Sequence, residues 1–281
     1  MALGNQVVRI PSVADGCPRC SGTGWEIIPD GGAGVARRCE CRKRDEAAQR
    51  LERVGIPALY QRCRLTNFQT HGDARTSAML LRARTLAERY VDRFLDLDTG
   101  RPRSTGLLFI GRPGAGKTHL AAAVLTELVK RYGVRGRFVD FTSLVHQIQS
   151  TFDHGSVETK RQVLDPVIRA DVLVLDELGA QKPTDWVMDN LYLIINSRYT
   201  EGLPTLFTTN FQLEEEADKG NESLDKGASD TAAARRLRLQ DALLSSRISA
   251  PLVSRLYEMT QPVVLSTLDY RRQVLQPLRR L

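Results

Sequence analysis

Residues 111–118 have the types and spacing of a phosphate-binding loop. They read GRPGAGKT, match G-x-x-x-x-G-K-[ST], and lie between an apolar run at 106–110 and an Ala- and Leu-rich run at 119–132. Such a strand, loop and helix aims backbone N–H groups at one phosphate chain, with Lys117 at the β/γ-phosphates and Thr118 on Mg²⁺. We therefore expect an ATP and Mg²⁺ site. The expected nucleotide contacts are Gly111, Pro113, Gly114, Ala115, Gly116, Lys117, Thr118 and His119.

Two acids follow a second apolar run, at 172–175. Four apolar residues without alternation indicate a strand buried on both faces, and ligands bind at the carboxyl ends of such parallel strands. We expect Asp176 to hold Mg²⁺ through water and Glu177 to polarise the attacking water. Asn210 ends a third run and is expected to hydrogen-bond that water or the γ-phosphate. Solvated acids and a simple strand cap are the alternatives.

Four of the five cysteines form two close pairs, Cys17 with Cys20 and Cys39 with Cys41. C-x-x-C places two thiolates on one turn, and a second close pair completes a tetrahedral zinc site. Disulfides are disfavoured because no signal peptide is evident, and a redox site would need a thioredoxin-like setting. Four unrelated buried cysteines would not cluster in this way. We expect structural zinc, while Cys63 is expected to pack in the core.

The intervening patterns predict an α/β protein with a parallel sheet flanked by helices, preceded by a small zinc-binding domain. Strands are expected at 24–28, 34–38, 106–110, 136–141, 172–175, 205–210 and 263–265. Helices are expected at 42–53, 74–97, 119–132, 142–152, 163–170, 183–199 and 252–259. The expected domains are a zinc module at 1–50, a linker at 51–73 and an ATPase domain at 74–281. Residues 212–240 are expected to form a mobile polar insertion.

The bulk composition is that of a soluble globular protein, with 42% hydrophobic and 26% charged residues among 281. No apolar run approaches the ~20 residues that span a bilayer, and the N-terminus does not resemble a secretory signal. We therefore expect a cytoplasmic protein without a membrane partner. The net charge of +7 favours a polyanionic partner.

Taken together, these motifs resemble the AAA+ ATPases. The finer resemblance is to replicative helicase loaders of the DnaC/DnaI type and to their relatives, the IstB-type transposition ATPases. The matching residues are 17–25, 38–41, 55–57, the nucleotide motifs, 254–256 and 269–271, which span nearly the whole chain. Two features depart from the family: Pro251 replaces an arginine, and the segment between Asn210 and Arg255 is longer than usual.

The resemblance implies roles for three arginines. Arg255 lies where the family has its arginine finger, which acts on ATP held by a neighbouring subunit and is worth ~10³–10⁵ in rate. Arg247 is the alternative for this role. Arg271 lies at the sensor 2 position and would touch the nucleotide of its own subunit.

The resemblance also implies contacts with single-stranded DNA in the central channel of a ring. The corresponding residues are Phe152, Thr184 and Trp186, and aromatic rings suit this role because every base has a face to stack on. Core packing is the alternative for the two aromatic residues. The N-terminal zinc module would grip the helicase.

Two functions follow from the resemblance. In the first, ATP binding assembles up to six subunits into a ring or spiral that holds single-stranded DNA. The zinc module then docks onto a hexameric DnaB-type helicase, and weak or partner-stimulated hydrolysis releases the loader during replication initiation. In the second, an IstB-like ATPase assembles on double-stranded DNA and recruits a transposase, a reading that the Cys₄ module disfavours. A third reading, a binding switch with negligible turnover, is disfavoured by Glu177.

Overall fold

The computed structural model describes residues 16–29, 34–152, 159–181, 184–213 and 243–265, and Tyr270. The chain divides into two compact units, Met1–Arg53 and Val54–Leu281. Arg271 and most of the expected insertion at 212–240 lie outside the described residues. No helix among the described residues is long and apolar enough to cross a membrane.

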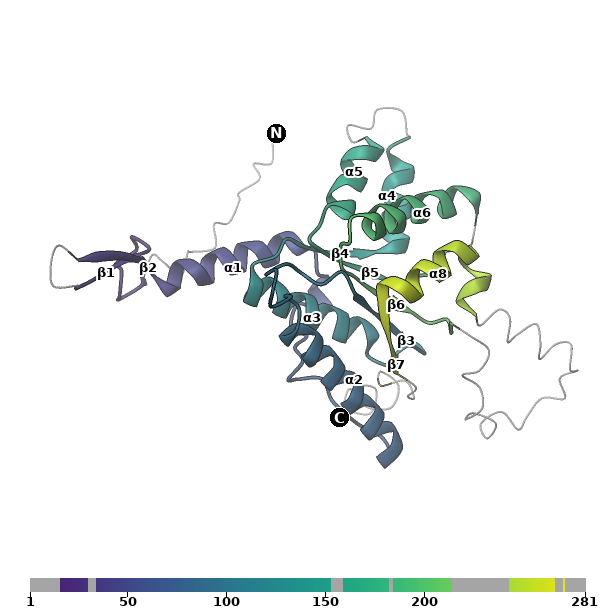
Figure 1. The fold of residues 1–281 in the computed structure, drawn as a ribbon, viewed down its shortest axis with the longest axis horizontal. Helices are drawn as coiled ribbons and strands as arrows, with labels where there is room; N and C mark the ends of the chain where they lie inside the picture. The colour runs from purple at the N-terminus through teal and green to yellow at the C-terminus, as the bar shows by residue number, and fades with distance from the viewer. Residues whose placement is uncertain are drawn as a thin grey trace, which may run out of the picture. The chain divides into compact units, whose positions relative to one another are not determined.

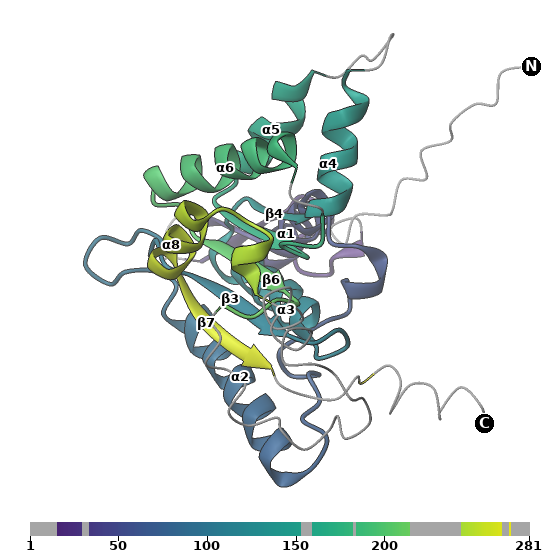
Figure 2. The same ribbon diagram turned by 90° about the vertical axis from the view of Figure 1, so that its right-hand side faces the viewer.

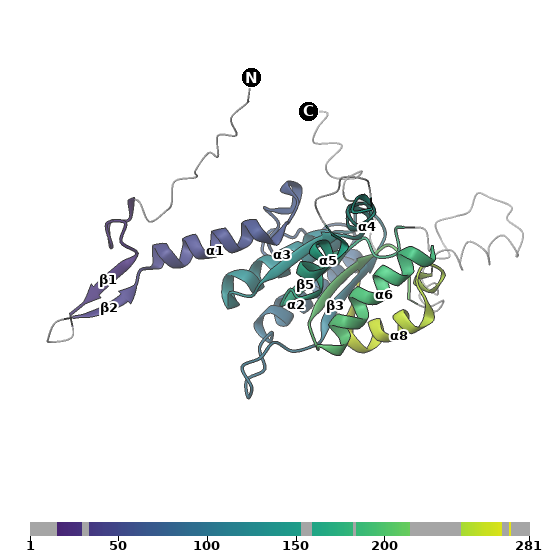
Figure 3. The same ribbon diagram turned by 90° about the horizontal axis from the view of Figure 1, so that it is seen from above.

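The first unit contains a hairpin and the helix that follows it (Figure 3). Strands β1 (Trp25–Ile28) and β2 (Val35–Arg38) pair antiparallel, and α1 runs over Glu40–Val54. Trp25 lies opposite Arg38 in the hairpin, and its ring centroid is 5.4 Å from the guanidinium of Arg42. Both hairpin arms and the charged helix confirm the elements expected from the sequence.

The second unit is built on a five-stranded parallel sheet (Figure 1). Its strands are β3 (Gly106–Gly111), β4 (Gly136–Asp140), β5 (Val172–Asp176), β6 (Thr205–Thr209) and β7 (Thr260–Leu265), in the order β4-β5-β6-β3-β7. Every residue of β5 and β6 is buried, as expected for β5 from its four apolar residues without alternation and for β6 as a second buried strand. Because β6 lies between β3 and β5, its carboxyl end lies between the strand that leads into the phosphate loop and the strand that ends at Asp176.

Helices cover both faces of this sheet. The helices are α2 (Ala74–Asp92), α3 (Lys117–Tyr132), α4 (Phe141–Ser150), α5 (Lys160–Ile168), α6 (Asp185–Thr200) and α8 (Ala250–Met259), with short 3₁₀ turns at Ala58–Tyr60 and Leu244–Ser246. Figure 2 shows α5 and α6 on one side of the sheet and α2 on the other. A cluster of buried apolar residues joins α4, α5, α6 and α8 to the sheet. Helix α3 packs beside α2 and against the strands.

Two helix ends differ from the expectation by more than two residues, each for a local reason. Helix α2 stops at Asp92, not at residue 97, because the side chain of Asp96 accepts hydrogen bonds from the N–H groups of Asp98 and Thr99 and closes a turn. Helix α5 begins at Lys160 because Thr159 and Gln162 form a capping box.

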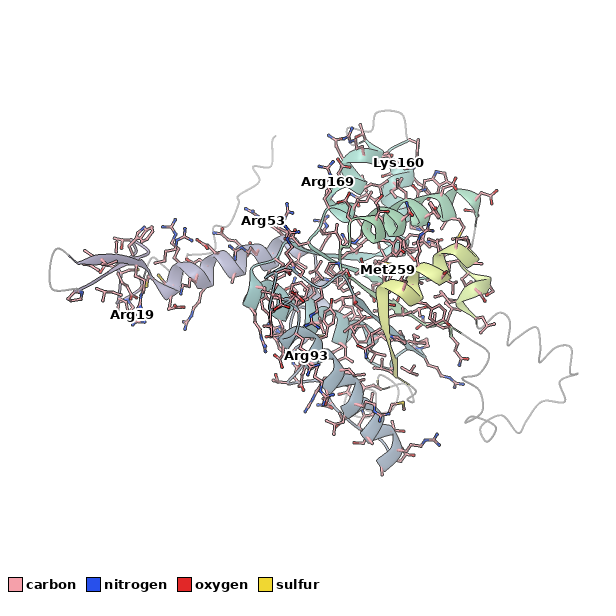
Figure 4. All side chains as sticks on the ribbon, viewed as in Figure 1. Arg19, Arg53, Arg93, Lys160, Arg169 and Met259 are labelled. Carbon is pink, nitrogen blue, oxygen red and sulfur yellow. The ribbon has the colours of Figure 1, made fainter. Side chains whose placement is uncertain are left out.

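A buried arginine joins α5, α6 and β6. The guanidinium of Arg198 donates to the carbonyls of Val167, Ile168 and Ala170 at the end of α5. Figure 4 labels Lys160, the first residue of α5, and Arg169, the residue that follows the helix. The guanidinium also donates to the carbonyl of Pro204 and, through Nε, to the hydroxyl of Thr205. Burial lowers the pKa of Arg198 to about 10. These bonds satisfy helix-end carbonyls that would otherwise be buried without partners.

Candidate nucleotide site

The phosphate loop connects β3 to α3 and depends on glycine for two reasons. Gly114 and Gly116 have φ angles of 79° and 94°, in the left-handed region that L side chains rarely adopt. Space is also short: a Cβ on Gly111 would lie 2.2 Å from the carbonyl oxygen of Leu265, and a Cβ on Gly116 would lie 2.7 Å from the ring of Phe68. The loop therefore has the close backbone packing that a phosphate cradle needs.

Lys117 and Asn210 come from neighbouring elements and meet at the loop. The Nζ atom of Lys117 donates to Oδ1 of Asn210 at 2.7 Å and to the carbonyl of Arg112 at 3.0 Å. The side chain of Lys117 is buried, and Asn210 follows directly after β6. The position of β6 in the sheet thus brings an amide next to the lysine, as the proposed contact of Asn210 with the γ-phosphate requires.

Asp176 is held by hydroxyl groups from two elements. Its Oδ1 accepts a hydrogen bond from Thr118 Oγ1 at 3.0 Å and one from Thr208 Oγ1. Burial raises the pKa of Asp176 above its usual range, although both hydroxyls oppose the rise. The Thr118 hydroxyl and the Asp176 carboxylate are hard oxygen ligands, so the pair suits Mg²⁺, which would shield the phosphate charge when bound.

Glu177 has an unusual backbone conformation. Its φ is 59°, which is uncommon for a residue other than glycine, and its N–H donates to Thr208 Oγ1 at 3.0 Å. Its side chain is exposed and lines the same cavity as the phosphate loop. Glu177 therefore faces the cavity where the sequence predicts the attacking water.

A cavity of about 300 Å³ lies over the loop, at the small end of the range for ligand sites. One wall comes from the loop, Glu177 and the end of β6. The other comes from Tyr270 and from residues 59–71, which fall in the segment expected to be a linker and lie in the second unit. The residues of this wall are Leu59, Tyr60, Cys63, Asn67, Phe68, Gln69, His71 and Tyr270. Tyr270 OH donates to Gln69 Oε1 at 2.9 Å and so joins this wall to the C-terminal part of the chain.

His119 fixes this segment against the loop. Its Nε2 lies 3.0 Å from the carbonyl oxygen of Arg64, and its ring meets Phe68 edge to face at 5.4 Å between centroids. Burial lowers the pKa of His119, so the imidazole is neutral at physiological pH. Sequence reasoning missed the wall of the cavity. The signal available was the aromatic pair Tyr60 and Phe68 in a polar stretch.

The two candidate finger arginines lie away from this cavity. Arg255 on α8 donates to Tyr192 OH at 3.1 Å, and its guanidinium is 4.8 Å from the ring centroid of Tyr192 and 5.8 Å from that of Tyr199. Arg247 lies 4.8 Å above the ring of Phe211. Among the described residues, the cavity wall includes neither arginine. Neither side chain contributes to the site of its own chain.

The three candidate DNA contacts gather at the end of α4 and the start of α6. The rings of Phe152 and Trp186 meet edge to face with centroids 6.4 Å apart, and Phe152 is 65% exposed. Thr184 caps α6 by accepting a hydrogen bond from the N–H of Val187. Trp186 also packs partly against the core, whereas Phe152 remains open to a ligand.

The four paired cysteines converge in the first unit. Their sulfur atoms all lie within 4.8 Å of one another, and Cys20, Cys39 and Cys41 are buried. Four sulfurs at ~2.3 Å from one Zn²⁺ would be about 3.8 Å apart, so the cluster matches a tetrahedral site. Glu26 accepts a hydrogen bond from Cys39 Sγ at 3.0 Å. The buried Cys63 lies in the other unit and takes no part.

The sheet order, the phosphate loop after β3, the acids after β5 and the asparagine after β6 define an AAA+ ATPase. The chain belongs to the family of IstB-like ATP-binding proteins, whose model matches residues 46–225.

Individual relatives are similar to this chain at 28% identity over the aligned residues. It is 28% identical to the replicative helicase loader DnaC of Escherichia coli (strain K12) over 69% of this chain and 75% of that protein. It is also 28% identical to the uncharacterised protein YqaM of Bacillus subtilis (strain 168), over 65% of this chain but only 57% of that protein. A crystal structure of the DnaC helicase loader superposes with a TM-score of 0.56, 28% identity, and coverage of 74% of this chain and 99% of that one.

Proposed function

We propose that this chain is an ATP-hydrolysing helicase loader that acts in the cytoplasm. ATP and Mg²⁺ bind at the phosphate loop, and subunits associate so that Arg255 of one completes the site of the next. The assembly holds single-stranded DNA at Phe152, Thr184 and Trp186. The Cys₄ unit binds Zn²⁺ and docks onto a DnaB-type hexameric helicase.

The observation that carries the proposal is the similarity to the DnaC loader, whose crystal structure is covered almost completely. The unit with the four-cysteine cluster precedes the ATPase unit in the sequence. Its hairpin exposes apolar residues such as Ile27, which is 76% exposed. An exposed apolar hairpin that is not needed for the nucleotide site is suited to a protein partner.

The second candidate is an IstB-like ATPase that assembles on double-stranded DNA and recruits a transposase. The match to the IstB-like family model supports it. That match begins at residue 46, after the four cysteines, so it does not account for them.

Co-purification with the replicative helicase of the same cell separates the two candidates. In the full chain, Ile27→Glu should reduce helicase capture at least tenfold. Leu97→Glu is the matched control, because Leu97 is 95% exposed and belongs to the ATPase unit. Equal capture of both variants would reject the docking role of the hairpin. Filaments on duplex DNA without helicase affinity would instead favour the transposition ATPase.

Hydrolysis itself is tested at Glu177. Glu177→Gln keeps the size of the side chain but removes the base, so ATP binding should persist while turnover falls by about 10²-fold or more. Glu201→Gln, at the exposed end of α6, is the control. Unchanged turnover of Glu177→Gln would show that this carboxylate is not the base.

A further inference from the structure

Thr208 contacts both acids of the nucleotide site. This residue of β6 is fully buried, and its Oγ1 donates to Oδ1 of Asp176 and accepts the N–H of Glu177 at 3.0 Å. The direction of these bonds is fixed, because a carboxylate only accepts and a backbone N–H only donates. One hydroxyl therefore joins the side chain of one acid to the backbone of the next.

The bond to Asp176 sets the orientation of the carboxylate. Thr118 of α3 and Thr208 of β6 both donate to the same oxygen, Oδ1 of Asp176. Thr118 is also the expected Mg²⁺ ligand of the phosphate loop. Thr208 is therefore the hydroxyl that holds Asp176 whether or not the cation engages Thr118.

The bonds to the next two residues stabilise an unfavourable backbone. Glu177 adopts a φ of 59°, a left-handed conformation that is unfavourable for an L residue. The Thr208 hydroxyl accepts the N–H of Glu177, and the Thr208 carbonyl accepts the N–H of Leu178 at 2.8 Å. Both contacts come from one residue of the adjacent strand, and together they direct the Glu177 side chain to the cavity.

Threonine at this position is not explained by strand preference alone. Strand β6 contains two other buried threonines, whose hydroxyl groups donate to backbone carbonyls and not to an acid. Thr205 Oγ1 donates to the carbonyl of Leu203, and Thr209 Oγ1 donates to the carbonyl of Leu178. Of the three, Thr208 is the one whose hydroxyl bonds to Asp176 and Glu177.

We propose that Thr208 is a positioning residue of the ATPase site, which orients Asp176 toward Mg²⁺ and holds Glu177 in its left-handed conformation. The proposal rests on the proposed ATP hydrolysis for its effect on turnover, but its effect on Mg²⁺ is independent of turnover. Removal of an outer-shell partner of a metal ligand typically weakens metal binding or activity about 10- to 100-fold.

The test compares Thr208→Val, Thr208→Ser and the control Thr205→Val in the full chain. The first removes the hydroxyl, the second retains it, and the third removes a buried hydroxyl at the other end of β6. The first readout is the Mg²⁺ concentration that half-saturates binding of a fluorescent ATP analogue, and the second is kcat measured apart from KM.

In Thr208→Val, the half-saturating Mg²⁺ concentration should rise about 10- to 100-fold, and kcat should fall by a similar factor. The KM of this variant in saturating Mg²⁺ should stay within about threefold of the wild-type value. In Thr208→Ser, the half-saturating Mg²⁺ concentration and kcat should both stay within about threefold of the wild-type values. Thr205→Val should lower thermal stability without changing either readout. Mg²⁺ titrations of Thr208→Val and wild type that agree within twofold would overturn the proposal. A wild-type protein that binds MgATP without turnover would reject the ATPase function, while the Mg²⁺ titration would still decide the role of Thr208.

Discussion

Asp176 is a carboxylate that the fold buries before any cation arrives. Burial raises its pKa in the folded state above the value in the unfolded chain. The folded protein therefore binds this proton more tightly than the unfolded chain does. Linkage then requires that the nucleotide-free protein loses stability as the pH rises from the usual Asp pKa through the folded one.

Asp176→Asn should consequently stabilise the nucleotide-free protein at neutral pH, by roughly 2–4 °C in melting temperature if the gain is about 1 kcal/mol. The same variant should lose the stabilisation that MgATP gives the wild type, because a cation ligand is gone. Thermal melts at pH 7 and near pH 3.5, with and without MgATP, check both effects. The difference between the nucleotide-free proteins should vanish at the lower pH. Asp98→Asn, on an exposed turn, is the control; equal behaviour of the two variants would contradict the prediction.

At the scale of elements, the ends of α4 and α6 carry the candidate DNA contacts. Trp186→Ala removes a stacking platform, so affinity for single-stranded DNA should fall about tenfold, in line with ~1–3 kcal/mol for each stacked base. Phe152→Ala should act in the same direction. Tyr257→Ala, a 42% exposed aromatic residue on α8, is the control. Fluorescence anisotropy at constant salt measures the affinities, and a similar loss in all three variants would remove the special role of this ring pair.

Local patterns predicted the strands and the helix that carry the candidate nucleotide site. The apolar runs of β3 and β5 lack alternation and lead directly into the loop and the two acids, and β6 leads into Asn210, so these residues were identifiable from the sequence. The cavity wall at residues 59–71 was not identifiable from the sequence. Its contacts with Gly116 and His119 join residues about 50 positions apart in the sequence, and the periodicity of apolar residues does not predict contacts over that separation. The pairing of Thr208 with both acids was equally hidden, because it depends on β6 lying beside β5.

At the scale of the whole molecule, the Cys₄ unit and the ATPase unit should respond separately to zinc removal. Cys39→Ser breaks the cluster and should reduce bound zinc from about one equivalent to a small fraction, with loss of the hairpin. ATP affinity should stay within about twofold, because the nucleotide cavity lies entirely in the second unit. Cys63→Ser is the matched control for zinc content only, because Cys63 lines the nucleotide cavity. Zinc analysis of both variants and nucleotide titration of Cys39→Ser check the two expectations. Equal zinc content in the two variants would reject the site.

A site shared between subunits gives a test by mixing. Lys117→Ala and Arg255→Ala should each lower ATP hydrolysis at least 10-fold, because each removes one half of the proposed site. An equal mixture should recover about a quarter of wild-type activity, since one neighbour pair in four combines an intact Lys117 with an intact Arg255 in a head-to-tail assembly. A parallel mixture with Arg247→Ala identifies which arginine acts. Mixtures no more active than the single variants would argue against a shared site.

The tyrosines around Arg255 have a consequence for such an assembly. The guanidinium already contacts a hydroxyl group and two aromatic rings within its own chain. Contact with a phosphate of the neighbouring subunit would therefore replace these contacts. Contacts of this kind are worth about 0.5–1 kcal/mol at an exposed site, which is subtracted from whatever the new contact contributes. The charge that develops during phosphoryl transfer has no counterpart in the resting subunit. Arg255 would therefore speed the reaction while adding little to the affinity between subunits, and the assembly could come apart readily once ATP is spent.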